Sequence, residues 1–147
     1  MDKLIWIIVA LLSGAVLPIQ AGLNARMGVA AQNSVYAAAI SFVVGTVGLI
    51  IYILVTRQTV SIDGLREVPI YFWLGGLLGA FYVTALVLVF PKLGPGLTFG
   101  LIVAGQMIVA VVLDHFNVLV AHPTPINLMK LLGIVLVIIG VVIIRKY

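Results

Sequence analysis

Long apolar stretches separated by short polar ones set the pattern of this chain. A hydrocarbon core about 30 Å thick takes about 20 helical residues to cross. Five stretches reach that length: Leu4 to Leu23, Val35 to Val55, Ile70 to Phe90, Leu97 to about Val120, and Ile126 to Ile144. Because their apolar runs are continuous rather than alternating, helices are favoured over barrel strands. We predict an all-α polytopic membrane protein with five transmembrane helices, in a single transmembrane domain over residues 1–147.

Composition supports a membrane protein. Hydrophobic residues make up 64% of the chain and charged residues 8%, with a mean hydropathy of +1.34, which lies outside the balance of soluble domains. The first stretch begins with Lys3, as a secretory signal would. Its apolar run is too long for a signal, and no small-x-small cleavage site follows, so we expect it to be retained as a span. The chain has no cysteine, which excludes disulfides and acyl anchors on cysteine.

The connections are short and polar. Pro91, Gly94, Pro95 and Gly96 predict a six-residue turn between spans three and four. A polar link is expected over Asn24 to Asn33, and a short interfacial helix within Arg57 to Pro69. None of these pieces could hold a soluble catalytic domain.

The basic residues divide evenly between the two predicted sides. Side one receives four of them, namely Lys3, Arg57, Arg66 and Lys130, and side two receives another four, namely Arg26, Lys92, Arg145 and Lys146. The positive-inside rule orients a chain by an excess of Lys and Arg in its short cytoplasmic loops, and here the difference is 4 − 4 = 0. One interpretation is insertion in both orientations in similar amounts. The alternative is that the first span or a single charge decides the orientation.

An odd number of spans gives that balance a consequence. Two copies inserted oppositely form an antiparallel pair of five plus five helices, which is an inverted repeat. Many secondary transporters carry such a repeat within one chain and bind their substrate where the halves meet. We therefore predict an antiparallel homodimer as the working form.

Enzyme motifs are missing from the sequence. It contains no GxxxxGK phosphate loop, no HExxH pair and no Ser/His/Asp constellation, so we expect neither an enzyme nor a nucleotide-driven pump. His115 and His122 are expected at the interface rather than on a metal, since no cysteine or second ligand pattern accompanies them. No cofactor, metal or nucleic-acid partner is expected. A small-molecule substrate and membrane lipid are the expected contacts besides a second copy.

Polar residues inside the spans are the candidate site, because an unpaired polar group in hydrocarbon is costly. Gln20 and Asn24 share one face of the first span, with Ser13 on the same face. In the second span, one stripe holds Ser34, Ser41, Gly45, Gly48 and Tyr52. We predict a substrate pathway lined by Gln20, Asn24, Tyr82 and Gln106. The alternative is that Gln20 and Gln106 only hold helices together and that Tyr82 fills the bundle.

Asp114 is the candidate for ion coupling, because it is the one acidic residue set in an apolar context. A carboxylate there could exchange protons as its surroundings alternate between wet and dry. In the alternative interpretation the fourth span ends near Leu113, and Asp114 lies in the headgroup layer and pairs with Lys130.

Several of these features together resemble a known family. They are Pro18, Gln20 and Asn24, the Trp73 to Gly79 glycine cluster, the Pro91 to Gly94 turn, Gln106, the run Asp114, His115 and Phe116, and Gly133. This set resembles the YdcZ-like family, a five-span branch of the drug/metabolite transporter superfamily, over essentially the whole chain. The resemblance implies a bacterial inner-membrane protein, with a transport role inferred from the superfamily. The four-span multidrug exporters of that superfamily rely on a first-helix Glu, where this chain has Gln20 and Asn24.

We therefore expect a secondary transporter of small organic solutes or metabolites. It is expected to export by alternating access in an antiparallel dimer. The alternative is a nonconducting accessory or structural membrane protein, or a subunit of a heterodimeric transporter. A passive channel is disfavoured, because no ring of like charges appears.

Overall fold

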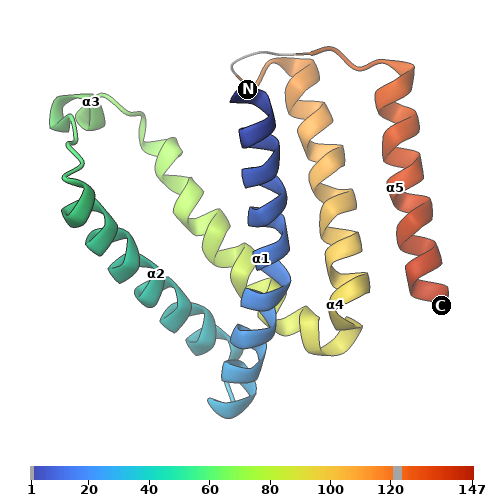
Figure 1. Cartoon of the computed structure of the whole chain (residues 1–147), viewed down its shortest axis with the longest axis horizontal. Coiled ribbons are helices and arrows are strands. Elements are labelled where there is room, and N and C mark those ends of the chain that lie inside the picture. The colour runs from blue at the N-terminus through green and yellow to red at the C-terminus, as the bar shows by residue number, and fades with distance from the viewer. Residues whose placement is uncertain (1, 121–123) are drawn as a thin grey trace. The chain divides into compact units, whose positions relative to one another are not determined.

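The computed structural model describes residues 2–120 and 124–147, and this part of the chain consists of helices and their connections (Figure 1). The elements are α1 (Asp2–Ala30), α2 (Ser34–Thr56), α3 (Ile62–Arg66), the 3-10 helix η1 (Ile70–Trp73), α4 (Leu74–Phe116) and α5 (Leu128–Lys146). By packing, the chain divides into two compact units, Met1–Pro91 and Lys92–Tyr147. We call them the first and the second unit and describe each by itself.

Four helical segments of the described residues are long and apolar enough to cross a membrane: Lys3–Ala30, Ser34–Thr56, Ile70–Phe116 and Leu128–Lys146. The all-α prediction is confirmed for the described residues, and the long apolar helices fit a polytopic membrane protein. The prediction of five separate long helices is wrong in its count, because helix continues where a turn was predicted between spans three and four.

Gly94 is the one point where α4 leaves helical geometry. Its φ of 74° and ψ of 166° fall in a region that is essentially restricted to glycine. Pro95 follows directly, in the first turn of the next helical stretch, where its missing N–H and fixed φ are tolerated. The predicted six-residue connection is therefore reduced to a single non-helical residue.

Two other predicted boundaries are wrong. The polar link expected from Asn24 does not start there, because α1 continues through Arg26 to Ala30 with good helix formers such as Ala25 and Met27. The fourth span does not reach Val120, because α4 ends at Phe116 and the next residue, Asn117, has a φ of +55°. A left-handed residue after the last turn is a common way for a helix to end.

The remaining boundaries lie close to the predictions. α2 extends the predicted second span by one residue at each end, and its N-cap Asn33 accepts hydrogen bonds from the backbone of Val35 and Tyr36. The short helix predicted in the longest loop is α3, whose N-cap Ser61 accepts from Gly64 N at 3.1 Å. α5 is capped by Asn127, which accepts from Lys130 N at 2.9 Å.

Small side chains form the interface of α1 with α2 in the first unit. Ala21 and Ala25 of α1 and Ala37 and Ala38 of α2 are all buried, the first and third of them completely. Small residues let helix backbones approach closely, which is how helices associate in lipid. The two helices come together at the end where α1 leads into α2 and diverge toward the other end (Figure 1).

The second unit holds its two helices together through a glycine. A Cβ added at Gly100 of α4 would lie 3.0 Å from Cγ2 of Val141 on α5, and Val141 is itself buried. A contact that short leaves no room for a methyl group unless the valine moves. Gly100 therefore sets how closely α5 can approach this part of α4.

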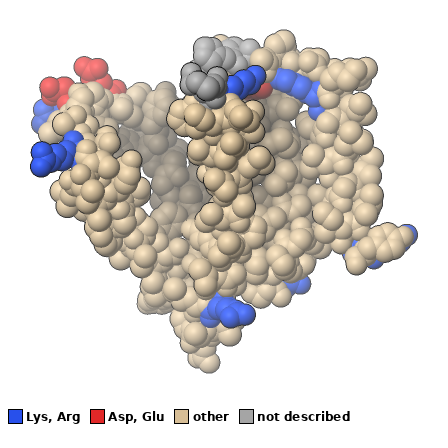
Figure 2. Space-filling model, in the orientation of Figure 1, with Lys and Arg blue, Asp and Glu red and all other residues tan. Residues whose placement is uncertain are grey.

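Most of the apolar surface of the helices is exposed, as expected where lipid or another protein covers it. Lys and Arg side chains lie near helix ends or, for Lys92, two residues before the non-helical Gly94 of α4. The visible faces between these points are free of charged residues (Figure 2). In the first unit, Lys3 lies in the first turn of α1, Arg57 directly follows α2 and Arg66 ends α3, whereas Arg26 lies near the other end of α1. This distribution is typical of membrane-spanning helices.

Candidate functional site

A groove lies in the first unit, between α1, α2 and the first half of α4, and we call it the polar groove because three polar side chains interrupt its mostly apolar lining. Its polar side chains are Gln20, Ser41 and Thr46, and its apolar walls include Phe42, Leu49 and Val83. The volume is about 240 Å³, slightly below the range of about 300–1,000 Å³ that is typical of pockets for drug-sized ligands. The sequence placed Gln20 on a pathway, and the structure places it in this groove.

Asn24 lies beside the groove and is joined to it by a hydrogen bond. Its Nδ2 donates to Oγ of Ser41 at 3.1 Å, which links α1 to α2. Asn24 is 6% exposed, and Ser41 lines the groove. This one contact therefore satisfies a buried amide and fixes the position of a hydroxyl in the groove wall.

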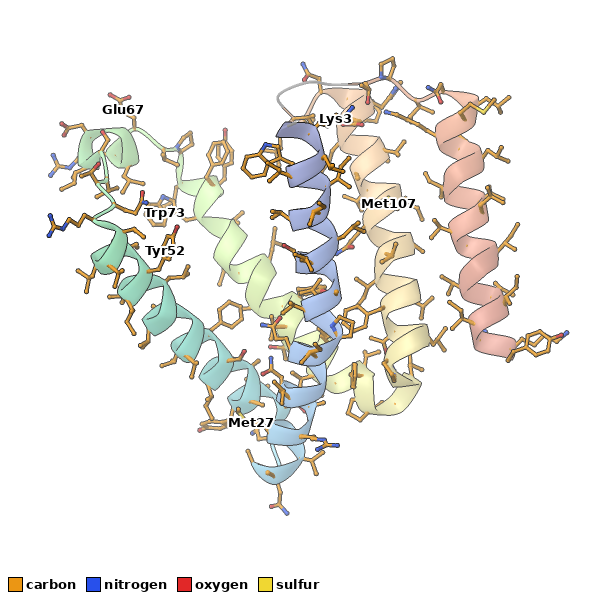
Figure 3. The ribbon with its side chains drawn as sticks, in the orientation of Figure 1. Lys3, Met27, Tyr52, Glu67, Trp73 and Met107 are labelled. Carbon is orange, nitrogen blue, oxygen red and sulfur yellow. The ribbon has the colours of Figure 1, made fainter. Side chains whose placement is uncertain are left out.

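The Gln20 amide makes no hydrogen bond with any residue that the structure describes. It is partly buried, one turn of helix before Asn24 on the same face. Figure 3 labels Met27 near the end where α1 and α2 converge, and Tyr52 toward the other end of α2. Gln20 precedes Met27 by about two turns, so it lies well inside α1 rather than at its converging end.

Tyr82 belongs to the first unit and precedes Val83, which lines the groove. Its hydroxyl oxygen is buried and has no hydrogen-bond partner among the described residues. A buried polar atom without a partner costs about 1–3 kcal/mol, so such atoms are uncommon unless something else binds them.

Gln106 lies in the second unit, on the part of α4 that follows Gly94. Its side chain is exposed and makes no hydrogen bond with any described residue. Thr98, on the same stretch of α4, is buried, and its hydroxyl has no hydrogen-bond partner among the residues that the structure describes. The groove of the first unit therefore collects only part of the predicted set, namely Gln20 with Asn24 beside it.

Asp114 lies in the last turns of α4 and pairs with Lys130 at the start of α5. Lys130 Nζ is 3.0 Å from Oδ2 of Asp114, and Thr124 Oγ1 donates to the same oxygen at 2.8 Å. Lys130 Nζ also donates to the Thr124 carbonyl oxygen at 2.7 Å. The ion pair of the alternative interpretation is present, and it joins the α4–α5 connection to the helices on either side.

His115 accepts a long hydrogen bond of 3.5 Å from the backbone N–H of Ile126, through Nδ1. His122 lies outside the described residues. Over residues 2–120 and 124–147 no three His, Cys, Asp or Glu residues lie close enough together to bind a metal ion.

Thr46 is the groove residue that sequence reasoning missed. It lies one position after Gly45, beside the predicted stripe and in helical register with Phe42 and Leu49, which also line the groove. The signal was present in that stripe, because Ser41 and Gly45 both line the groove. The stripe could not predict that Gln20 of α1 would line the same groove.

Comparison with known proteins identifies the family. The model of the family DMT_YdcZ, described as "Putative inner membrane exporter, YdcZ", matches residues 5–143. No curated protein and no solved structure matches the chain. The match covers nearly all of the sequence, and the long apolar helices agree with a multi-pass protein of the inner membrane. The description is of an exporter rather than an enzyme. The chain therefore belongs to the YdcZ family of inner membrane exporters.

Proposed function

We propose that this chain is a secondary transporter that exports small organic solutes or metabolites by alternating access, as an antiparallel dimer. The observation that carries the proposal is the polar groove among the apolar helices of the first unit, which Gln20 and Ser41 line and where Asn24 donates to Ser41 from beside the groove. Unpaired polar side chains within membrane-spanning helices are costly in lipid, and a solute that binds them would offset that cost. Membership of an exporter family supports the same conclusion.

The proposal includes five membrane crossings. α4 has 43 residues, and at about 1.5 Å per residue a straight helix of that length would extend about 65 Å. That is about twice the thickness of the hydrocarbon core. We propose that α4 crosses twice and reverses at Gly94. With five crossings the two ends of the chain lie on opposite sides, so two oppositely inserted copies would form an inverted repeat.

In this mechanism Gln20, Asn24, Tyr82 and Gln106 line the solute path. The unsatisfied amides and hydroxyls would bind the solute in place of water. Asp114 couples transport to ion movement by exchanging its pairing with Lys130 for a proton or cation.

Reconstituted vesicles test the proposal, with uptake measured for a broad panel of labelled solutes. Saturable uptake by the native chain supports a carrier. We expect Gln106→Leu to abolish this uptake while leaving the dimer intact, as chemical cross-linking would show. Unchanged uptake by that variant would remove Gln106 from the path. No flux for any solute, with a dimer present, would instead favour an accessory or structural protein.

A further inference from the structure

The polar groove of the first unit offers hydrogen bonds and no charge. Gln20 presents an amide with a donor and an acceptor, and Ser41 and Thr46 present hydroxyls. Arg26, the nearest basic residue of α1, lines a different and mostly apolar pocket with Gly22 and Pro91. The charge at that end of α1 therefore does not belong to the groove.

The helical segments around the groove also lack charged residues. No Asp, Glu, Lys or Arg occurs at residues 4–25 of α1, at 34–56 of α2 or at 70–91 of η1 and α4. A charged solute entering the groove would lose its hydration without gaining a counter-charge from these walls. The desolvation free energy of a charged group is large, whereas hydrogen bonds to the groove can offset the smaller desolvation free energy of a neutral polar group.

From this arrangement we propose that the groove binds small, uncharged solutes that carry hydroxyl or amide groups. The inference rests on the proposed function, since it takes the groove to be part of the solute path. The apolar walls formed by Phe42, Leu49 and Val83 accommodate a short carbon skeleton. The Asn24–Ser41 hydrogen bond holds one polar wall in place before the solute arrives. The volume of about 240 Å³ lies slightly below the range of about 300–1,000 Å³ for drug-sized ligands, which favours small solutes.

Thiol accessibility measures this selectivity without a known substrate, because the chain contains no cysteine. Thr46→Cys places a single thiol in the groove. The variant is assembled in lipid nanodiscs, where reagents reach both faces, and labelled with three methanethiosulfonates. One is the uncharged hydroxyethyl reagent, one the anionic sulfonatoethyl reagent, and one the cationic trimethylammonioethyl reagent. We expect the uncharged reagent to react at least about tenfold faster than either charged one, after correction for intrinsic reactivity.

Two matched variants supply the corrections. Gln58→Cys lies on the exposed connection after α2 and gives the intrinsic rate of each reagent. Val47→Cys lies on α2, is half exposed and does not line the groove, so it reports reaction through lipid. Equal corrected rates for all three reagents at Thr46→Cys would overturn the proposal. So would a rate no higher than that of Val47→Cys, because the groove would then be closed to water-soluble molecules.

This test is separate from the vesicle assay. Selective labelling of Thr46→Cys without flux in vesicles would leave the neutral groove standing and contradict the transporter. Flux of charged solutes together with unselective labelling would support a transporter and contradict the neutral site.

Discussion

At the scale of single residues, the most informative contact is the hydrogen bond from Asn24 to Ser41. The sequence showed that Asn24 shares a helix face with Gln20, but it could not identify the partner, because partners depend on how two helices approach. The structure supplies that partner on α2, at 3.1 Å. The buried amide of Asn24 therefore links two helices and also fixes the position of the Ser41 hydroxyl in the groove.

We expect Asn24→Ala and Ser41→Ala to be coupled. Hydrogen bonds between membrane helices contribute about 0.6 kcal/mol on average and at most about 1.7 kcal/mol, so the coupling should fall in that range. A double-mutant cycle on unfolding in detergent measures it. Ser13→Ala is the control, since the Ser13 hydroxyl bonds only to its own helix, at Val9 O. Strictly additive effects of Asn24→Ala and Ser41→Ala would contradict the contact.

Asp114 and Lys130 make the second residue-scale prediction. Asp114→Lys should lower the melting temperature, because two cations would then face each other beside Thr124. The charge swap, Asp114→Lys with Lys130→Asp, should recover most of the loss. Flux should not recover with it, because the proposed coupling requires the carboxylate on α4. If the swap also restored flux, the pair would be structural and Asp114 would have no part in coupling.

At the scale of elements, hydrophobic runs predicted the helices well and their ends less well. α2 matched within one residue at each end, and the short helix α3 lay in the loop where it was expected. The runs failed at α1, which continues through the polar residues Asn24 and Arg26, and at the Pro91 to Gly96 segment. The prolines and glycines of that segment predicted a loop. In the structure Gly94 alone is non-helical, and Pro95 lies in the first turn of the helical stretch that follows.

Gly94→Ala tests that join. A Cβ at φ 74° and ψ 166° is strained, and residues forced into such regions cost about 1–3 kcal/mol each. We expect the unfolding free energy in detergent to fall by that amount. Gly105→Ala is the control on the same helix, since its added Cβ meets nothing within 4 Å and alanine favours helix. Equal stability of the two variants would show that the backbone at Gly94 is ordinary.

Close packing at Gly100 predicts a second element-scale result. Gly100→Val should weaken the contact of α5 with α4, because even a Cβ would lie 3.0 Å from Val141. Val141→Ala added to Gly100→Val should recover part of the loss by making room. Melting temperatures of the single and double variants check this, and no recovery in the double variant would contradict the packing.

At the scale of the whole molecule, composition and the apolar pattern were sufficient to predict a multi-pass membrane protein. The resemblance to the YdcZ-like family predicted the inner membrane, and the family match agrees. The candidate site was predicted only in part. Gln20 lies in the groove and Asn24 beside it, whereas Gln106 lies in the second unit with an exposed side chain. Polarity within a span indicates that a residue needs a partner, but the identity of the partner comes from packing between helices.

The central claim is that oppositely inserted copies pair to form the transporter. A single cysteine added after Tyr147 reports the side on which that end lies, since the chain has no other thiol. Intact cells are labelled with a membrane-impermeant maleimide, and the signal is compared with total labelling after permeabilisation. The evenly divided Lys and Arg residues predict that about half of the molecules are labelled. Labelling of all molecules or of none would fix one orientation and contradict the antiparallel homodimer.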